Sequence, residues 1–193
     1  MGKAQIREQI RSRLATISPA ERAELSRQTV SRLAKQEVWQ ISKSVLGYLA
    51  LKDELDIFVA LEVALKTGKT VTLPRHVQEE GVYCAAVLSG EARQFLKGAF
   101  GIPEPSSEAP VIPLNRLDFV LVPGLAFDPR GRRLGRGKGF YDRLLAQVSG
   151  IKCGVALDEQ IVEELPAEPH DMAMNFILTP TRWLVVESAP TGT

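Results

Sequence analysis

The distribution of apolar residues predicts an alternation of helices and short strands. Ile6, Ile10 and Leu14 lie four residues apart, which is typical of a helix with one side facing the core. Continuous apolar runs such as 119–122 are typical of buried strands. We expect helices over residues 2–15, 19–36, 53–66 and 158–165 and from residue 140 on, and strands over 44–51, 69–73, 82–88, 119–122, 151–157 and 175–179. Residues 106–113 are expected to form an exposed linker.

Polar residues mark where two of these helices should begin. Ser18, Pro19 and Glu21 form a capping-box pattern with proline at the first helical position. Asp53 is expected to be the N-cap of the helix over 53–66, with Asp56 at its third position. On this interpretation both aspartates stabilise a helix start.

Strands that alternate with helices indicate an α/β fold. We expect one domain over residues 1–193, with a largely parallel central sheet in a three-layer α/β/α arrangement. Ligands of such folds bind beyond the carboxyl ends of the strands. Functional residues are therefore expected where the strands end.

Composition narrows the possible partners. The net charge is +1, so no global field favours nucleic acid or an anionic membrane. Cys84 and Cys153 lie far apart without a CxxC pattern, and we expect two buried, reduced thiols. The sequence has no signal-peptide pattern and no apolar run long enough to span a bilayer. We expect a cytoplasmic monomer that binds a small molecule and neither nucleic acid nor membrane.

The stretch 122–145 carries the strongest candidate chemistry. It joins the apolar run 119–122 to a predicted helix start through a loop rich in glycine, arginine and lysine. Glycines allow close approach of the backbone to an anion, and a helix start and cationic side chains attract it. The spacing matches neither the Walker loop nor the dinucleotide fingerprint. The pattern therefore indicates a phosphate or polyanion site, with a mobile, solvated surface loop as the alternative.

The sequence RLGRGKGFYDRLL, preceded by DFVLVPGLAFDPRG, closely resembles the signature of the 5-formyltetrahydrofolate cyclo-ligase family. The resemblance implies the ATP-dependent conversion of 5-formyltetrahydrofolate to 5,10-methenyltetrahydrofolate, with magnesium and with ADP and phosphate as products. It also explains why no Ser-His-Asp or Cys-His constellation is found, because phosphoryl transfer needs positioning and charge neutralisation more than a protein nucleophile.

The same resemblance implies roles for individual residues. The catalytic set is Arg136, Lys138 and Tyr141. The nucleotide-binding residues are Lys3, Arg7, Arg133, Leu134, Gly135, Arg136, Gly137, Lys138, Gly139, Phe140 and Tyr141. The folate-binding residues are Leu51, Glu54, Asp56, Arg136, Gly137, Lys138, Gly139 and Phe140. The magnesium ligands are Asp142 and Asp171.

The sequence departs from the family pattern at two positions. Asn175 stands where the family usually has a second acidic residue, and an asparagine adds no negative charge to a metal site. Phe140 stands where the family commonly has tyrosine, so the ring remains and the hydroxyl is absent. Glu104, in a loop that also matches the family, is a weak site candidate, and His76 is left outside the catalytic set.

Simpler interpretations compete with several of these assignments. Lys3 and Arg7 share a basic stripe with Arg11, and such stripes are usually solvated helix faces. Asp142 is compatible with a carboxylate that only stabilises a helix start. For the whole protein, Asn175 leaves open a folate- or nucleotide-binding relative with weakened catalysis. An arginine-rich nucleic-acid module is the other alternative, which the near-neutral charge disfavours.

Overall fold

The computed structural model describes residues 2–77, 82–88, 95–97, 103–166, 168 and 172–186. Within these residues, eight strands form one mixed sheet in the order β12-β11-β10-β7-β1-β2-β3-β6. Its strands are β1 (Ser44–Leu46), β2 (Thr70–Val77), β3 (Val82–Val87), β6 (Val111–Ile112), β7 (Phe119–Pro123), β10 (Ile151–Val155), β11 (Phe176–Leu178) and β12 (Trp183–Val185). Two short pairs lie outside it, β4 (Leu96–Lys97) with β5 (Pro103–Glu104) and β8 (Ala126–Phe127) with β9 (Arg133–Leu134).

The five central strands, from β11 to β2, are parallel, and antiparallel strands extend the sheet on both sides. The predicted α/β class with a largely parallel sheet is therefore confirmed. Because β1 and β7 are neighbours and run in the same direction, the segments that follow Leu46 and Pro123 leave the sheet at the same edge.

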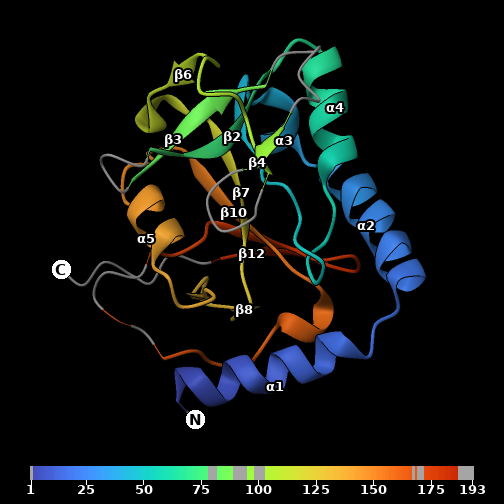
Figure 1. Cartoon of the computed structure of the whole chain (residues 1–193). Helices are drawn as coiled ribbons and strands as arrows, with labels where there is room; N and C mark the ends of the chain where they lie inside the picture. Colours follow the sequence, from blue (N-terminus) through green and yellow to red (C-terminus); the bar gives the residue numbers. More distant parts are fainter. Residues whose placement is uncertain are drawn as a thin grey trace, which may run out of the picture.

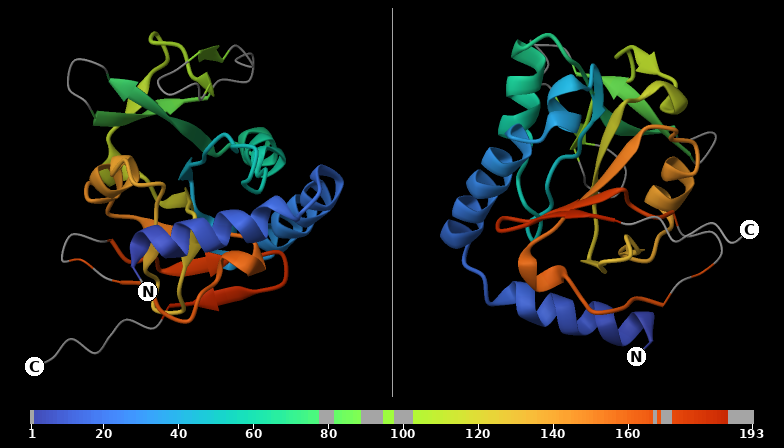
Figure 2. Two further views of the ribbon diagram at one scale, coloured as in Figure 1. Left: turned by 60° about the horizontal axis from the view of Figure 1, so that its bottom comes forward. Right: turned by 180° about the vertical axis from the view of Figure 1, so that it is seen from behind.

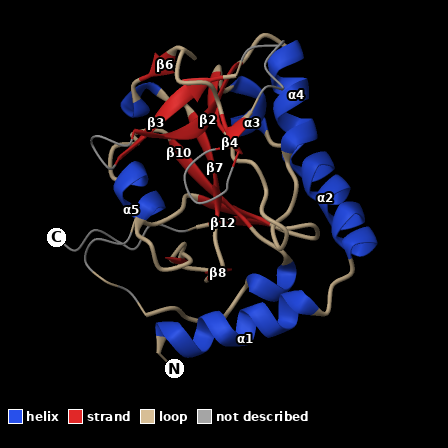
Figure 3. Cartoon of the chain, viewed as in Figure 1, coloured by secondary structure: helices blue, strands red, loops and turns tan. Residues whose placement is uncertain are grey.

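Helices cover both faces of the sheet (Figures 1 and 3). They are α1 (Lys3–Ala15), α2 (Pro19–Ala34), α3 (Glu37–Ile41), α4 (Phe58–Lys66) and α5 (Phe140–Leu145), with 3-10 turns at Leu114–Arg116 and Asp158–Gln160. On one face α2, α3 and α4 pack into a large core, and on the other face α5 packs into a smaller one. The helix α1 lies across one end of the molecule (Figure 2). Its predicted stripe of Ile6, Ile10 and Leu14 is buried.

Local signals gave the second helix correctly but not the fourth. Ser18 Oγ accepts a hydrogen bond from the Glu21 backbone N–H, 3.2 Å away, as the capping pattern predicts. The prediction that Asp53 is an N-cap is wrong. The helix α4 begins at Phe58, whose N–H donates to Asp56 Oδ1 at 2.9 Å. Residues 51–54 form a turn instead, in which the Glu54 N–H donates to the Leu51 carbonyl. The Asp53 carboxylate forms an ion pair with Arg136.

Other differences follow from tertiary packing. The strand expected over 44–51 ends at Leu46, and the acidic helix expected over 158–165 is only a 3-10 turn. The expected linker 106–113 contributes β6 to the main sheet, because Val111 and Ile112 pair with β3. Both α3 and β12 were not expected. Cys153 is a buried free thiol as predicted, whereas Cys84 is only half-buried.

Asp128 ties the hairpin of β8 and β9 to the segment that follows β10. Its carboxylate is fully buried and accepts backbone N–H bonds from Arg130, Arg132 and Leu165, at 3.0, 3.0 and 2.9 Å. These bonds fix the turn from which the glycine loop emerges.

Replacing Asp128 should therefore destabilise the protein strongly. Asp128→Ala leaves three backbone N–H groups without their acceptor, of which that of Leu165 is buried and the other two are part-buried, and we expect the free energy of unfolding to fall by about 3 kcal/mol or more. Glu164→Ala is the matched control, because this exposed carboxylate only pairs with arginines of the same turn and such surface ion pairs contribute little to stability. Urea denaturation of both variants tests this, and equal losses would contradict the assigned role.

Candidate active site

A cavity of about 270 Å³ opens beyond the carboxyl ends of β1 and β7. One wall is the segment 48–54 after β1, and another is the glycine loop with the first turns of α5. Residues from β2, β3 and β5 complete it. The loop that the sequence singles out thus lies where ligands of parallel α/β folds bind.

The glycine loop passes into α5 through left-handed backbone. Gly137 has φ +99° and Gly139, the N-cap residue of α5, has φ +65°, a region that residues with a side chain rarely adopt. These conformations let the chain turn from β9 into α5 while Lys138 and Phe140 line the cavity.

Arg133 is held on the floor of the site. Its guanidinium is almost fully buried, forms an ion pair with Asp142 and donates to the Pro123 carbonyl at 3.3 Å. It also lies over the Tyr141 ring, 5.5 Å from the centroid. Burial raises the pKa of the Tyr141 hydroxyl well above its ordinary range. That hydroxyl is therefore protonated at neutral pH and can donate a hydrogen bond but not act as a base.

Arg136 joins the loop to the segment after β1. Its Nη2 contacts Asp53 Oδ1 at 2.6 Å and Glu54 Oε1 at 3.0 Å, and its Nε donates to Glu54 Oε1 at 3.3 Å. Glu54 Oε2 accepts the Leu51 N–H at 3.0 Å. Burial raises the pKa of the Glu54 carboxyl, although the Leu51 N–H and Arg136 act in the opposite direction. Glu54 therefore takes up a proton more readily than an exposed glutamate.

The other loop arginines are paired as well. Arg130 contacts Glu164 at 2.7 Å, and Arg132 contacts Glu164 at 3.1 Å and donates to the Leu165 carbonyl at 2.8 Å. All four arginines of the predicted basic loop are therefore in local ion pairs.

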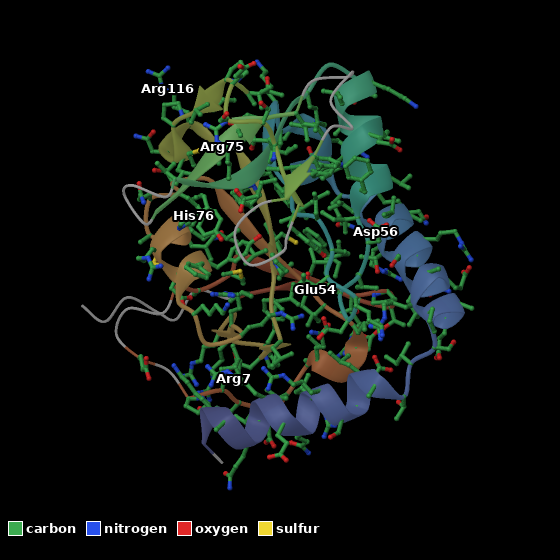
Figure 4. All side chains as sticks on the ribbon, viewed as in Figure 1. Arg7, Glu54, Asp56, Arg75, His76 and Arg116 are labelled. Carbon is green, nitrogen blue, oxygen red and sulfur yellow. The ribbon has the colours of Figure 1, made fainter. Side chains whose placement is uncertain are left out.

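Arg7 reaches the glycine loop from the far end of the chain. Its Nε donates to the Gly135 carbonyl at 3.0 Å, and its side chain projects from α1 towards the interior (Figure 4). Lys3, one turn earlier, forms an ion pair with Glu168 at 3.1 Å. The structure thus brings Arg7 to the predicted loop, whereas Arg11 on the same helix is exposed.

Only some of the remaining predicted site residues line the cavity. Leu51 and Glu54 line the cavity, whereas Asp56 is exposed and does not. Leu134 is buried beneath the loop and packs in the core. Asp171 lies outside the described residues. Among the described residues no cluster of three His, Cys, Asp or Glu side chains could hold a metal ion.

Asn175 lies at the amino ends of the parallel strands, whereas the cavity lies beyond their carboxyl ends. It precedes β11, and its amide oxygen accepts the backbone N–H of Lys152 at 2.8 Å. Its own N–H donates to the Lys152 carbonyl at 2.8 Å. The side chain thus holds β10 and β11 together at their amino ends.

Sequence reasoning missed part of the cavity lining. Leu49 and Tyr83 carried no recognisable signal, because both look like ordinary strand residues. Glu104 was only a weak candidate, yet it lines the cavity and is nearly buried. No described helix is long and apolar enough to cross a membrane.

The fold and the site together define an α/β enzyme whose cavity combines a glycine-rich cationic loop at a helix start with carboxylates on the facing wall. The chain belongs to the 5-formyltetrahydrofolate cyclo-ligase family, whose model matches residues 1–180. It is therefore a ligase of folate one-carbon metabolism that converts 5-formyltetrahydrofolate to 5,10-methenyltetrahydrofolate, in a family of ATP-dependent enzymes.

Individual relatives agree with this assignment. The chain is 35% identical to the 5-formyltetrahydrofolate cyclo-ligase of Mycolicibacterium smegmatis, over 74% of this chain and 76% of the relative. It is 32% identical to that of Escherichia coli K12, over 90% and 97%. The NMR structure of Aquifex aeolicus 5,10-methenyltetrahydrofolate synthetase is similar with a TM-score of 0.87 and 33% identity, covering 100% of this chain and 97% of that one.

The raised pKa of Glu54 should appear in the pH dependence of activity. As the pH falls, Glu54 is protonated at a pH above the ordinary value of 4.5, and its attraction for Arg136 is lost. We expect kcat/KM for 5-formyltetrahydrofolate to decline on this acidic side. In Glu54→Gln the decline should vanish and kcat/KM should be low throughout. Profiles between about pH 5 and 8 test this, and an unchanged acidic limb in the variant would refute it.

Proposed function

We propose that the reaction proceeds by phosphorylation of the formyl oxygen. A formamide carbon is a poor electrophile, because the nitrogen lone pair is delocalised into the carbonyl group, and its oxygen is a poor leaving group. The formyl oxygen takes the γ-phosphoryl group as the bond to ADP breaks. Nitrogen-10 then attacks the activated carbon and loses its proton, and the carbon–oxygen bond breaks to release phosphate. The result is the methenyl ring, ADP and phosphate.

The observation that carries this proposal is the cationic lining of the cavity. Arg133, Arg136 and Lys138 come from one loop and line the same space. Phosphoryl transfer depends on such positioning and charge neutralisation. We assign Arg136 and Lys138 to the oxygens of the transferred phosphoryl group, and the backbone of Gly135, Gly137 and Gly139 to the nucleotide phosphates. Arg133, paired with Asp142, would hold the loop around them.

The aromatic residues of α5 have separate roles in this proposal. Tyr141, protonated at neutral pH, would donate its hydroxyl to an oxygen that becomes negative during transfer. Phe140 would pack on the folate or adenine ring. Leu134 would contribute through its backbone, since its side chain is buried in the core.

The folate would bind against the segment that follows β1. Leu51 offers an apolar surface, and Glu54 Oε2 retains one lone pair beyond its bond to the Leu51 N–H, which can accept an N–H of the pterin. Asp56 is proposed as a folate contact on the resemblance alone. Because one chain supplies every wall, we propose that it acts as a monomer.

Magnesium fits the donors at the start of α5. Asp142 lines the cavity, its side chain is one-third exposed, and it carries one oxygen beyond the one that Arg133 contacts. Magnesium needs only one or two protein carboxylates beside phosphate oxygens and water. We propose Asp142 as one ligand and Asp171 as the other. When bound, the ion would neutralise phosphate charge and align the γ-phosphoryl group.

Two alternatives are less well supported. A relative with weakened catalysis was suggested by Asn175, but this side chain bonds the Lys152 backbone away from the cavity, so its lack of charge need not weaken a metal site. A nucleic-acid module was suggested by the arginine-rich loop. Its Arg130 and Arg136 contact carboxylates within the chain, which leaves less positive charge for a polyanion.

Magnesium titration of turnover tests both the reaction and the metal site. Wild-type protein with 5-formyltetrahydrofolate and ATP should form the methenyl product, measured by its near-ultraviolet absorbance, only with magnesium. Asp142→Asn keeps an acceptor for Arg133 but loses the charge, and should raise the magnesium requirement at least about tenfold. Asn175→Ala should raise it little. A larger effect at Asn175 would mean that the metal site is wrongly assigned, and absence of product from folded wild-type protein would refute the reaction.

We expect Arg7 of α1 to contribute to ATP binding. Arg7→Ala removes the guanidinium that contacts the Gly135 carbonyl, and the loss of a charge-assisted contact should cost about 1.5–3 kcal/mol, or roughly tenfold or more in the KM for ATP. Arg11→Ala, on an exposed part of the same helix, is the control and should leave the KM unchanged. If Arg7→Ala also changes neither KM nor kcat, Arg7 does not serve the nucleotide and its bond to the Gly135 carbonyl is only structural.

A further inference from the structure

Two nearly buried carboxylates line the cavity, and among the residues that the structure describes only Glu54 has a cationic partner. Glu54 is 9% exposed and is paired with Arg136. Glu104, on β5, is 7% exposed. Among the described residues, no lysine, arginine or histidine side chain lies within ion-pair distance of Glu104. Its Oε2 accepts the backbone N–H of His76 at 2.9 Å.

This arrangement leaves hydrogen-bonding capacity that faces the cavity. A carboxylate has about four acceptor sites, and the His76 N–H occupies one. A buried charge without a cation is unfavourable unless it receives further hydrogen bonds. The bond to β2 holds Glu104 in place, so the unused capacity is fixed in orientation. Such a group is suited to donors on a ligand.

The surroundings of Glu104 favour a flat, donor-rich ring. Tyr83, His76 and Phe140 form an edge-to-face trio, with centroids 5.2 Å apart for His76 and Tyr83 and 5.5 Å apart for Tyr83 and Phe140. The Glu104 carboxylate lies beside this trio, since it accepts the His76 N–H and lines the cavity together with Tyr83 and Phe140. Figure 4 shows His76 close to α5, which carries Phe140.

We propose that Glu104 is a specificity-determining contact that recognises the N3–H and 2-amino edge of the pterin. This edge presents two parallel N–H donors, the geometry that a carboxylate accepts from a guanidinium. Glu54 is less suited to the role, because Arg136 donates twice to its Oε1 and Leu51 once to its Oε2. The inference rests on the proposed folate site and extends it to the wall formed by β2, β3 and β5.

The variant Glu104→Gln tests this assignment. Its amide oxygen can still accept the His76 N–H, so the fold should be kept, as a thermal melt would check. It cannot accept both pterin donors, and we expect the Kd for 5-formyltetrahydrofolate, measured by calorimetry without ATP, and its KM to rise about tenfold. The KM for ATP should not change. Glu108→Gln, an exposed position in the same segment, removes the same charge and should leave all three constants unchanged.

A substrate analogue separates direct recognition from a structural role. The 2-desamino-2-methyl analogue of 5-formyltetrahydrofolate lacks one of the two donors. Wild-type protein should bind it about tenfold more weakly than the natural substrate, and Glu104→Gln should bind both within about twofold of each other. Equal discrimination by the two proteins, or an unchanged Kd in Glu104→Gln, would overturn the assignment. Failure of wild-type protein to turn over 5-formyltetrahydrofolate would instead contradict the proposed function.

Discussion

Charge pairing gives the glycine-rich loop its shape. A segment with this many glycines loses much conformational entropy when it is ordered, so contacts outside the segment must hold it. Arg133 is held by Asp142 on α5, and Arg136 by Glu54 on the segment after β1. Arg7 of α1 holds the Gly135 carbonyl. The adjacent helix α5 and two distant parts of the sequence, α1 and the segment after β1, therefore converge on one loop that lines the cavity.

In the proposed function, the same pairing would be exchanged for a ligand. Burial raises the pKa of Glu54 even though Arg136 lies beside it, so the unfavourable desolvation of this carboxylate is not fully offset. A pair in such balance can be opened by a stronger anion. A phosphate group that enters the cavity would give Arg136 a new partner and would leave Glu54 free to accept a donor from the other substrate. Arg136 would then hold the loop in place without ligand and would bind the phosphate group when the ligand is present.

The sequence predicts what is local and misses what depends on tertiary partners. The four-residue stripe of Ile6 and Ile10 predicted α1 because one helix face determines it. Asp53 looked like a helix cap because its neighbours permit one, but Arg136, eighty-three residues away, uses its carboxylate. The family motif identified the glycine loop for the same reason that α1 was found, namely that its residues are contiguous. Tyr83 was missed because only pairing of β2 with β3 brings it to the cavity.

The mixed character of the sheet explains how one small fold accommodates two substrates. The parallel strands β1 and β7 bring the acidic segment and the glycine loop to one edge, where we propose that the phosphate groups bind. Parallel strands alone would leave this site open on the side of β2. The antiparallel strand β3 and the short β5 continue past that edge and contribute Tyr83 and Glu104 to the cavity. In the proposed function, the pterin ring would pack against this antiparallel extension, and the formyl group would face the glycine loop that is proposed to activate it.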